Sequence, residues 1–163
     1  MAILKIARMG HPVLRRAAEP VPDPSAPEIR RLVRDMIETL EDIGGAGLAA
    51  PQIHESVRIA VLVLDEQTDP HIWINPVITP IGDEMISSYE GCLSVPGLYA
   101  PTVRAMRAAV EGFDVHGKPV RVEGTGLMAR CLQHEVDHLD GKVFLDRLAG
   151  DARKAALRAL RNR

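Results

Sequence analysis

With 163 residues, 46% of them hydrophobic, the chain is predicted to form a single domain around one core. A net charge of −2 and an aromatic content of only 3% argue against a nucleic-acid surface on which bases stack. Two cysteines are too few for a disulfide framework, and no signal peptide or apolar run of about 18 residues is visible, so a cytoplasmic location without a membrane partner is expected.

The first predicted element is an amphipathic helix that ends at Gly44-Gly45. Ser25 and Glu28 flank Pro27 in the pattern of a capping box with proline in the first turn. Apolar residues then recur at helical spacing and predict a core-facing stripe. This stripe consists of Ile29, Leu32, Val33, Met36, Ile37 and Leu40.

Extended segments follow the helix. Residues 57–64 are rich in β-branched residues and predict a short buried strand, and residues 72–81 are also expected to be extended. Residues 108–115 and 120–123 flank a turn at 116–118. Strands that precede a late helix indicate an α+β fold, with mixed or antiparallel sheets packed around that helix.

The late helix, predicted over residues 127–139, carries the most informative motif. This segment contains no Gly or Pro and is rich in helix formers. His134 and His138 then lie one turn apart on the same face, where both imidazoles can bind one metal ion. Glu135 lies beside that metal, where its carboxylate can take a proton from a water molecule. The motif therefore indicates a water-activating metal site and a hydrolase.

The third protein ligand is not determined by this motif. A catalytic metal usually has three protein ligands and one open position. No glutamate follows Glu135, and Phe144 stands where metzincin proteases place a third histidine. The downstream aspartates that remain candidates are Asp137, Asp140, Asp146 and Asp151.

The two cysteines differ as candidate ligands. Cys131 shares the helix face of the histidines but lies about 10.5 Å along the axis from His138, so we expect a small buried residue that does not ligate. Cys92 lies in a turn rich in glycine and proline after a strand. As a candidate third ligand, Cys92 is not ranked by periodicity above the four histidines outside the motif. These four histidines are otherwise expected to be surface or capping residues. They are His11, His54, His71 and His116.

Three segments together resemble the peptide deformylase family. They are residues 45–52 (GAGLAAPQ), residues 90–94 (EGCLS) and residues 133–138 (QHEVDH). All three signatures occur in the family's order, and residues 10–15 and 144–147 are similar to the family as well. The resemblance therefore covers nearly the whole chain.

The resemblance implies that Cys92, His134 and His138 hold one divalent metal. Fe(II) is the ordinary metal of the family, and zinc, nickel or cobalt can occupy the same site. A Cys-His-His set with an open fourth position suits both iron and zinc, so the ligands alone do not decide between them.

The resemblance also implies the reaction, which is hydrolysis of the N-formyl group from the formyl-methionine of newly synthesised polypeptides, with release of formate. Glu135 is then the general base. The Gln52 side-chain amide and the Leu93 backbone N–H are the implied donors to the negative charge that forms on the formyl oxygen.

Substrate contacts are implied at five positions. Ala46, Gly47 and Gly91 are expected to bind an extended peptide through their backbones. Leu127 and Cys131 are expected to line an apolar pocket for the methionine side chain. Two features depart from this pattern: position 46 is often a larger aliphatic residue in the family, and Arg130 adds a charge near the pocket. A structural ion pair between Glu90 and Arg104 is also implied.

The C-terminal segment, residues 151–163, is basic and is predicted to be a short helix. We expect residues 1–150 to be the catalytic part and this tail to belong to the same domain. Its basic residues are Arg153, Lys154, Arg158, Arg161 and Arg163. The tail is interpreted either as a solvated helix or as a site that docks on the ribosome near the exit tunnel. The chain itself is expected to be a monomer.

Two other classes of function stay open at this point. One is a metallopeptidase that cleaves ordinary peptide bonds with the same His-Glu-x-x-His motif. The other is a non-catalytic, ribosome-associated domain with a structural metal, although structural zinc sites usually have four protein ligands.

Overall fold

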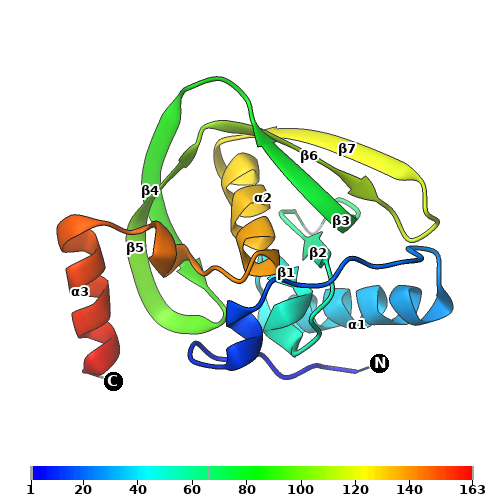
Figure 1. Ribbon diagram of the computed structural model, residues 1–163, viewed down its shortest axis with the longest axis horizontal. Helices are drawn as coiled ribbons and strands as arrows, with labels where there is room; N and C mark the ends of the chain where they lie inside the picture. Colours follow the sequence, from blue (N-terminus) through cyan, green and yellow to red (C-terminus); the bar gives the residue numbers. More distant parts are fainter. Residues whose placement is uncertain (1, 66, 163) are drawn as a thin grey trace.

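The computed structural model describes residues 2–65 and 67–162, and Figure 1 shows its helices and strands. The helices are α1 (Pro27–Ile43), α2 (Gly126–Leu139) and α3 (Gly150–Arg161). The strands are β1 (Gly47–Ala49), β2 (Ile59–Leu62), β3 (His71–Pro80), β4 (Met85–Cys92), β5 (Val95–Ala105), β6 (Arg107–Phe113) and β7 (Pro119–Thr125). Short 3-10 helices span Pro12–Arg15, Ala50–Ile53 and Phe144–Arg147.

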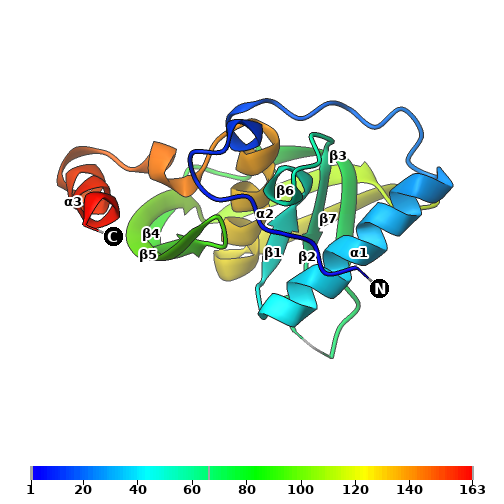
Figure 2. The same ribbon diagram turned by 90° about the horizontal axis from the view of Figure 1, so that it is seen from below.

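The strands form two antiparallel sheets. Five strands pair in the order β1-β2-β3-β6-β7, whereas β4 and β5 form a separate two-stranded sheet. Figures 1 and 2 show α2 between the two sheets, α1 on the outer face of the five-stranded sheet, and α3 outside the β4–β5 hairpin. The predicted α+β fold with strands around the late helix is confirmed.

Helix α1 begins where it was predicted to begin, but with a different cap. Pro27 is its first residue, and Gly44 ends it in the left-handed conformation with φ of 63°. The expected capping box is wrong: the N-cap is Ala26, and no side chain caps the helix. The Ser25 hydroxyl donates to Asp23 Oδ1 at 2.7 Å instead, because Asp23 forms a local turn with Ser25 before the helix starts.

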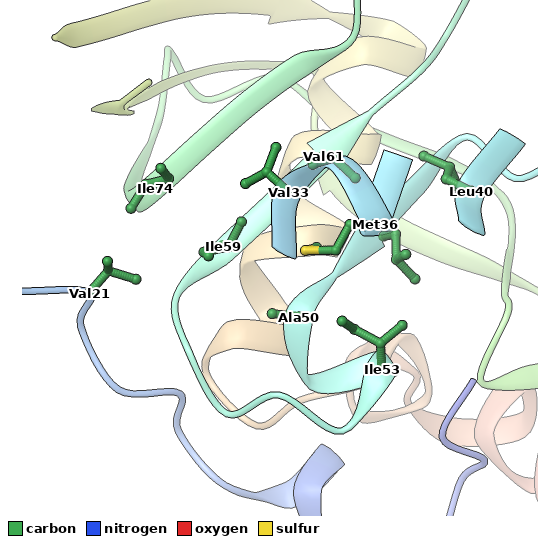
Figure 3. Packing of buried hydrophobic residues seen from close by; sticks show 10 residues of the cluster. Val21, Val33, Met36, Leu40, Ala50, Ile53, Ile59, Val61 and Ile74 are labelled. Carbon is green, nitrogen blue, oxygen red and sulfur yellow. The ribbon is translucent and has the colours of Figure 1, made fainter. Parts of the chain in front are cut away.

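The predicted stripe of α1 packs on the first strands of the large sheet. Val33, Met36 and Leu40 are buried, and the other three stripe residues are partly buried against the same cluster. Figure 3 shows the α1 side chains meeting Ile59 and Val61 of β2. Burial of one such side chain contributes about 1.5–3 kcal/mol, so this cluster anchors β1 and β2 beside α2.

The predicted strands agree with β2, β3, β6 and β7 to within a few residues. The long strand β5, which only two residues separate from β4, was not predicted as such. The strand contains Pro96, Gly97 and Pro101, which are residue types that disfavour β-strands and so argued against a strand in the sequence. The two prolines can be accommodated because each strand of a two-stranded sheet has one free edge, where a missing N–H breaks no pairing.

Helix α3 confirms the helical prediction for the C-terminal segment. Ala156 is buried and Leu160 partly buried in a cluster with Val95 and Leu98 of β5 and with the segment around Phe144. Arg163, the last basic residue of the tail, lies outside the described residues. In the described part of the chain, no helix is both long and apolar enough to cross a membrane.

Candidate active site

Helix α2 places two imidazoles side by side. His134 and His138 are four residues apart and buried, and their Nε2 atoms are 3.1 Å apart. His134 Nδ1 lies 2.6 Å from Glu90 Oε1 of strand β4. When Nδ1 carries the ring proton and donates a hydrogen bond to this carboxylate, the lone pair of Nε2 is free to bind a metal.

The β4–β5 hairpin brings a thiol to the same point. Cys92 is the last residue of β4, and its Sγ lies 3.3 Å from His138 Nε2. The ligand atoms of Cys92, His134 and His138 all lie within 4.8 Å of one another. Among the described residues, 2–65 and 67–162, these three side chains are the cluster of His, Cys, Asp or Glu residues that could bind one metal ion.

The electrostatics of this group fit a divalent cation. Burial disfavours a charged His134, but interactions with Cys92 and with the Glu90 carboxylate outweigh it and raise the His134 pKa well above its ordinary value. These neighbours therefore favour positive charge between the ligands. Burial lowers the pKa of His138 well below its ordinary value, which keeps this imidazole in the neutral form that binds metals.

Glu135 follows His134 on α2 and lines the same cavity as Cys92 and His134. Its side chain is buried, and its Oε2 has no hydrogen-bond partner among the described residues. Burial raises the Glu135 pKa to about 7, so the carboxyl group can accept and release a proton near neutral pH. Gly47 makes room for this carboxyl group: a Cβ at position 47 would lie 2.3 Å from Glu135 Oε1.

Gln52 faces the thiol from the other side. It is 1% exposed, and its Oε1 accepts a hydrogen bond from the Ala49 backbone N–H at 2.9 Å. This contact fixes the amide orientation, so that Nε2 lies 3.5 Å from Cys92 Sγ and 3.3 Å from Ser94 Oγ. The Gln52 amide group therefore points its donor side toward the metal ligands.

Leu93 lies in the turn between β4 and β5, next to Cys92. Its side chain packs over Gly45, where an added Cβ would lie 3.0 Å from Leu93 Cδ1 and 2.8 Å from Leu40 Cδ1. The glycine of this first signature thus allows the hairpin turn to approach the end of α1. Close approach of these two segments forms one edge of the site.

The ligand group opens into a cavity of about 530 Å³. The five residues expected to contact a substrate all line it: Ala46, Gly47, Gly91, Leu127 and Cys131. Cys131 borders the cavity without joining the ligand group, and burial raises its pKa to about 12, so it stays a neutral thiol. The cavity therefore combines a ligand group, a buried carboxyl group and an apolar wall.

Two aromatic residues of this cavity were not predicted from the sequence. Tyr89 and Tyr99 are the only tyrosines of the chain, and both line the cavity while remaining 73% and 68% exposed. The Tyr99 ring lies against Gly91, where an added Cβ would be 2.6 Å from Tyr99 Cε1. The sequence did contain one indication that the tyrosines lie near the site, because each is within seven residues of Cys92. In the structure they lie on the two paired strands β4 and β5.

A buried ion network lies behind the histidines. The expected pair is confirmed, since Arg104 donates to both carboxylate oxygens of Glu90, at 2.6 and 3.2 Å. Arg104 also contacts the carboxylate of Asp137, which Arg147 binds from the other side. Hydrogen bonds with Arg147 and Arg104 outweigh the effect of burial and lower the Asp137 pKa. Asp137, which sequence reasoning left open as a metal ligand, is thus engaged by two arginines.

Known proteins similar to this chain share one family. The family model described as polypeptide deformylase matches residues 3–154. A peptide deformylase of Parafrankia sp. is 47% identical over 161 residues, which cover 99% of this chain and 87% of the relative. The crystal structure of a Legionella pneumophila peptide deformylase superposes with a TM-score of 0.91 at 40% identity and covers 99% of this chain and 95% of that one.

A second solved structure carries a ligand. The peptide deformylase of Ehrlichia chaffeensis in complex with actinonin has a TM-score of 0.90 and 38% identity, with coverage of 99% of this chain and 98% of that one. The match thus extends over almost the full length of both chains. This chain belongs to the polypeptide deformylase family.

Proposed function

We propose that this enzyme hydrolyses the N-formyl group of formyl-methionine at the start of newly synthesised polypeptides and releases formate. The observation that carries the proposal is the convergence of Cys92 Sγ with the Nε2 atoms of His134 and His138 beside the buried carboxyl group of Glu135. Membership in the family and the actinonin complex of the Ehrlichia relative support the same reaction.

Cys92, His134 and His138 would hold one divalent metal. When bound, such a metal lowers the pKa of a water molecule and polarises the formyl oxygen. We propose Fe(II) as the physiological metal, with zinc, nickel and cobalt as ions that the same ligands accept. The Glu90 carboxylate would orient the His134 ring through Nδ1.

Glu135 would move the protons of the reaction. Its carboxylate takes a proton from the attacking water while the water oxygen bonds to the formyl carbon. The same group then returns the proton to the departing amine as the carbon–nitrogen bond breaks. The pKa of about 7 supports both roles, because the group is neither a strong acid nor permanently protonated near neutral pH.

Gln52 and Leu93 would stabilise the negative charge on the formyl oxygen. The Gln52 amide is held by the Ala49 N–H, which supports its role as a fixed donor. Replacing Gln52 by leucine should therefore lower kcat about 10²–10³-fold, the usual effect of removing one such donor. Steady-state rates of formate release measure this effect. An unchanged kcat in the metal-loaded Q52L variant would contradict the role.

Gly47 offers a separate test of how Glu135 is placed. An alanine Cβ there would lie 2.3 Å from Glu135 Oε1 and 2.6 Å from Leu62 Cδ2, so one of these groups must move. We expect G47A to lower the free energy of unfolding by about 1–3 kcal/mol and to reduce kcat by displacing the carboxyl group. Denaturant unfolding and formate release measure the two effects. Wild-type values for both would contradict the close packing at Gly47.

The substrate peptide would lie extended along Ala46, Gly47 and Gly91, with backbone hydrogen bonds to both sides. Leu127 and Cys131 would contact the methionine side chain. The alanine at position 46 leaves this region wider than a larger aliphatic residue would, so we propose a tolerant pocket for the first residue.

The direct test of the reaction is formate release from formyl-Met-Ala by anaerobically purified protein of measured metal content. We expect formate to be released, while acetyl-Met-Ala and internal peptide bonds stay intact. Cleavage of internal bonds would favour a metallopeptidase. Failure of fully metal-loaded protein to act on any of these peptides would favour a non-catalytic domain.

We propose further that the enzyme works in the cytoplasm as a monomer, that residues 1–150 form its catalytic part, and that the basic tail docks on the ribosome near the exit tunnel. The exposed basic residues of α3 support docking through charge. Ribosome binding by the intact chain and by a chain that ends at Gly150 tests this point, and equal affinities would exclude the role of the tail.

A further inference from the structure

The proposed metal site is assembled from two separate parts of the fold. The thiol comes from the β4–β5 hairpin, whereas both imidazoles come from α2. The hairpin forms a sheet of its own among the described residues, so pairing with the five-stranded sheet does not hold it against α2. Side-chain contacts between hairpin and helix therefore help to set the distance between Cys92 and the histidines, and they include those of Gln133 with the Ala105 backbone and of Arg104 with Asp137.

Arg130 makes three such contacts. It lies on α2, one turn before His134, and is 6% exposed. Its Nη1 donates to Glu90 Oε2 at 2.9 Å and to the Thr102 carbonyl oxygen at 3.0 Å, and its Nη2 lies 3.4 Å from the Ile86 carbonyl oxygen. One guanidinium thus joins the helix to both strands of the hairpin.

The contact with Glu90 leads directly to a proposed ligand. Glu90 Oε1 faces His134 Nδ1 at 2.6 Å, while Oε2 accepts from Arg130 at 2.9 Å and from Arg104 Nε at 3.2 Å. Arg104 comes from β5 of the same hairpin as Glu90. Of the two arginines that bind this carboxylate, Arg130 is therefore the one anchored on the metal-binding helix.

We infer that Arg130 is a positioning residue for the metal centre, which holds the β4–β5 hairpin on α2 and thereby fixes Cys92 and the His134 ring relative to each other. The inference rests on the proposed metal site. Because Arg130 also borders the cavity, a role in substrate binding is the competing explanation, and the two differ in their effect on metal affinity.

The test compares three variants. R130M keeps the length of the side chain but removes its donors, and R130K keeps the charge but loses the planar fork. R58M is the matched control, because Arg58 also binds α2, through the Leu139 carbonyl oxygen at 3.1 Å and Asp140 at 3.0 Å, without contacting Glu90. For each variant we would measure the Co(II) affinity by chelator competition and the visible spectrum of the Co(II) form. We would also measure the Tm of the metal-free protein and the kcat and KM of the metal-loaded enzyme.

We expect R130M to bind Co(II) about tenfold or more weakly, in line with the loss of other groups that orient metal ligands, and to show a changed spectrum. R130K should lie between R130M and wild type, and R58M should keep the wild-type affinity and spectrum even if its Tm falls.

A purely structural role predicts a lower Tm with unchanged affinity and spectrum, and either this result or an effect on KM alone would overturn the inference. If R130M does not fold, the affinity and spectrum of R130K decide. The Co(II) affinity and the Co(II) spectrum do not depend on formate release. A failure of the proposed deformylation reaction can therefore be distinguished from a failure of the proposed role of Arg130.

Discussion

Replacing Glu135 by glutamine is expected to lower the rate of formate release about 10²–10⁴-fold while the fold and the bound metal remain. Glutamine has nearly the shape of glutamate, so the space beside Gly47 stays filled. It cannot accept the proton of the attacking water, and this loss accounts for the expected effect. Formate release, metal analysis and thermal unfolding of the same preparation measure the three quantities.

The interpretation of the E135Q result depends on the metal. If the variant retains one metal per chain and its Tm, the lost rate reports proton transfer rather than site assembly. Substantial turnover by the metal-loaded variant would contradict the assignment of Glu135 as the base. The buried Oε2, which has no partner among the described residues, makes this position the strongest candidate for that role.

Replacing Cys92 by alanine is expected to release the metal and to reduce formate release to background. The variant removes the only proposed ligand that comes from the hairpin, which leaves two imidazoles on one helix. Loss of a partner that merely orients a ligand lowers metal affinity about 10–100-fold, and loss of a ligand should exceed that range. Metal content after dialysis and chelator competition measure the change.

Cys131 provides the matched control for this experiment. It lines the same cavity but does not belong to the ligand group, so C131A should keep its metal. Equal metal loss from both variants would indicate that the cysteines act through packing. Retention of metal and activity by C92A would contradict the thiol ligand.

Local sequence spacing was sufficient for the parts of the site that lie on one element. The four-residue spacing of His134 and His138 on a segment without helix breakers placed both imidazoles on one face, as observed. The stripe of α1 was predictable for the same reason. Its cap was not, because Asp23 competes for Ser25 through a local turn that no periodicity reveals.

Contacts between distant segments were beyond such reasoning. Spacing did not rank Cys92 above the other candidate ligands, since it is 46 residues from His138 and only the hairpin brings it there. Arg130 was predicted to add a charge near the methionine pocket, and it does line the cavity, but its bonds to Glu90 and to carbonyl oxygens of the hairpin could not be predicted from the sequence. The depth of Glu135, which sets its pKa, also follows only from the packing of both sheets around α2.

The central claim is that one thiolate and two imidazoles share a metal ion, and X-ray absorption at the zinc edge of zinc-loaded protein tests it most directly. We expect one sulfur at about 2.3 Å and two nitrogens at about 2.0–2.1 Å from the metal, with the sulfur signal retained in C131A and absent from any zinc that C92A still binds. A wild-type spectrum without a sulfur neighbour, or one that C92A leaves unchanged, would contradict the account.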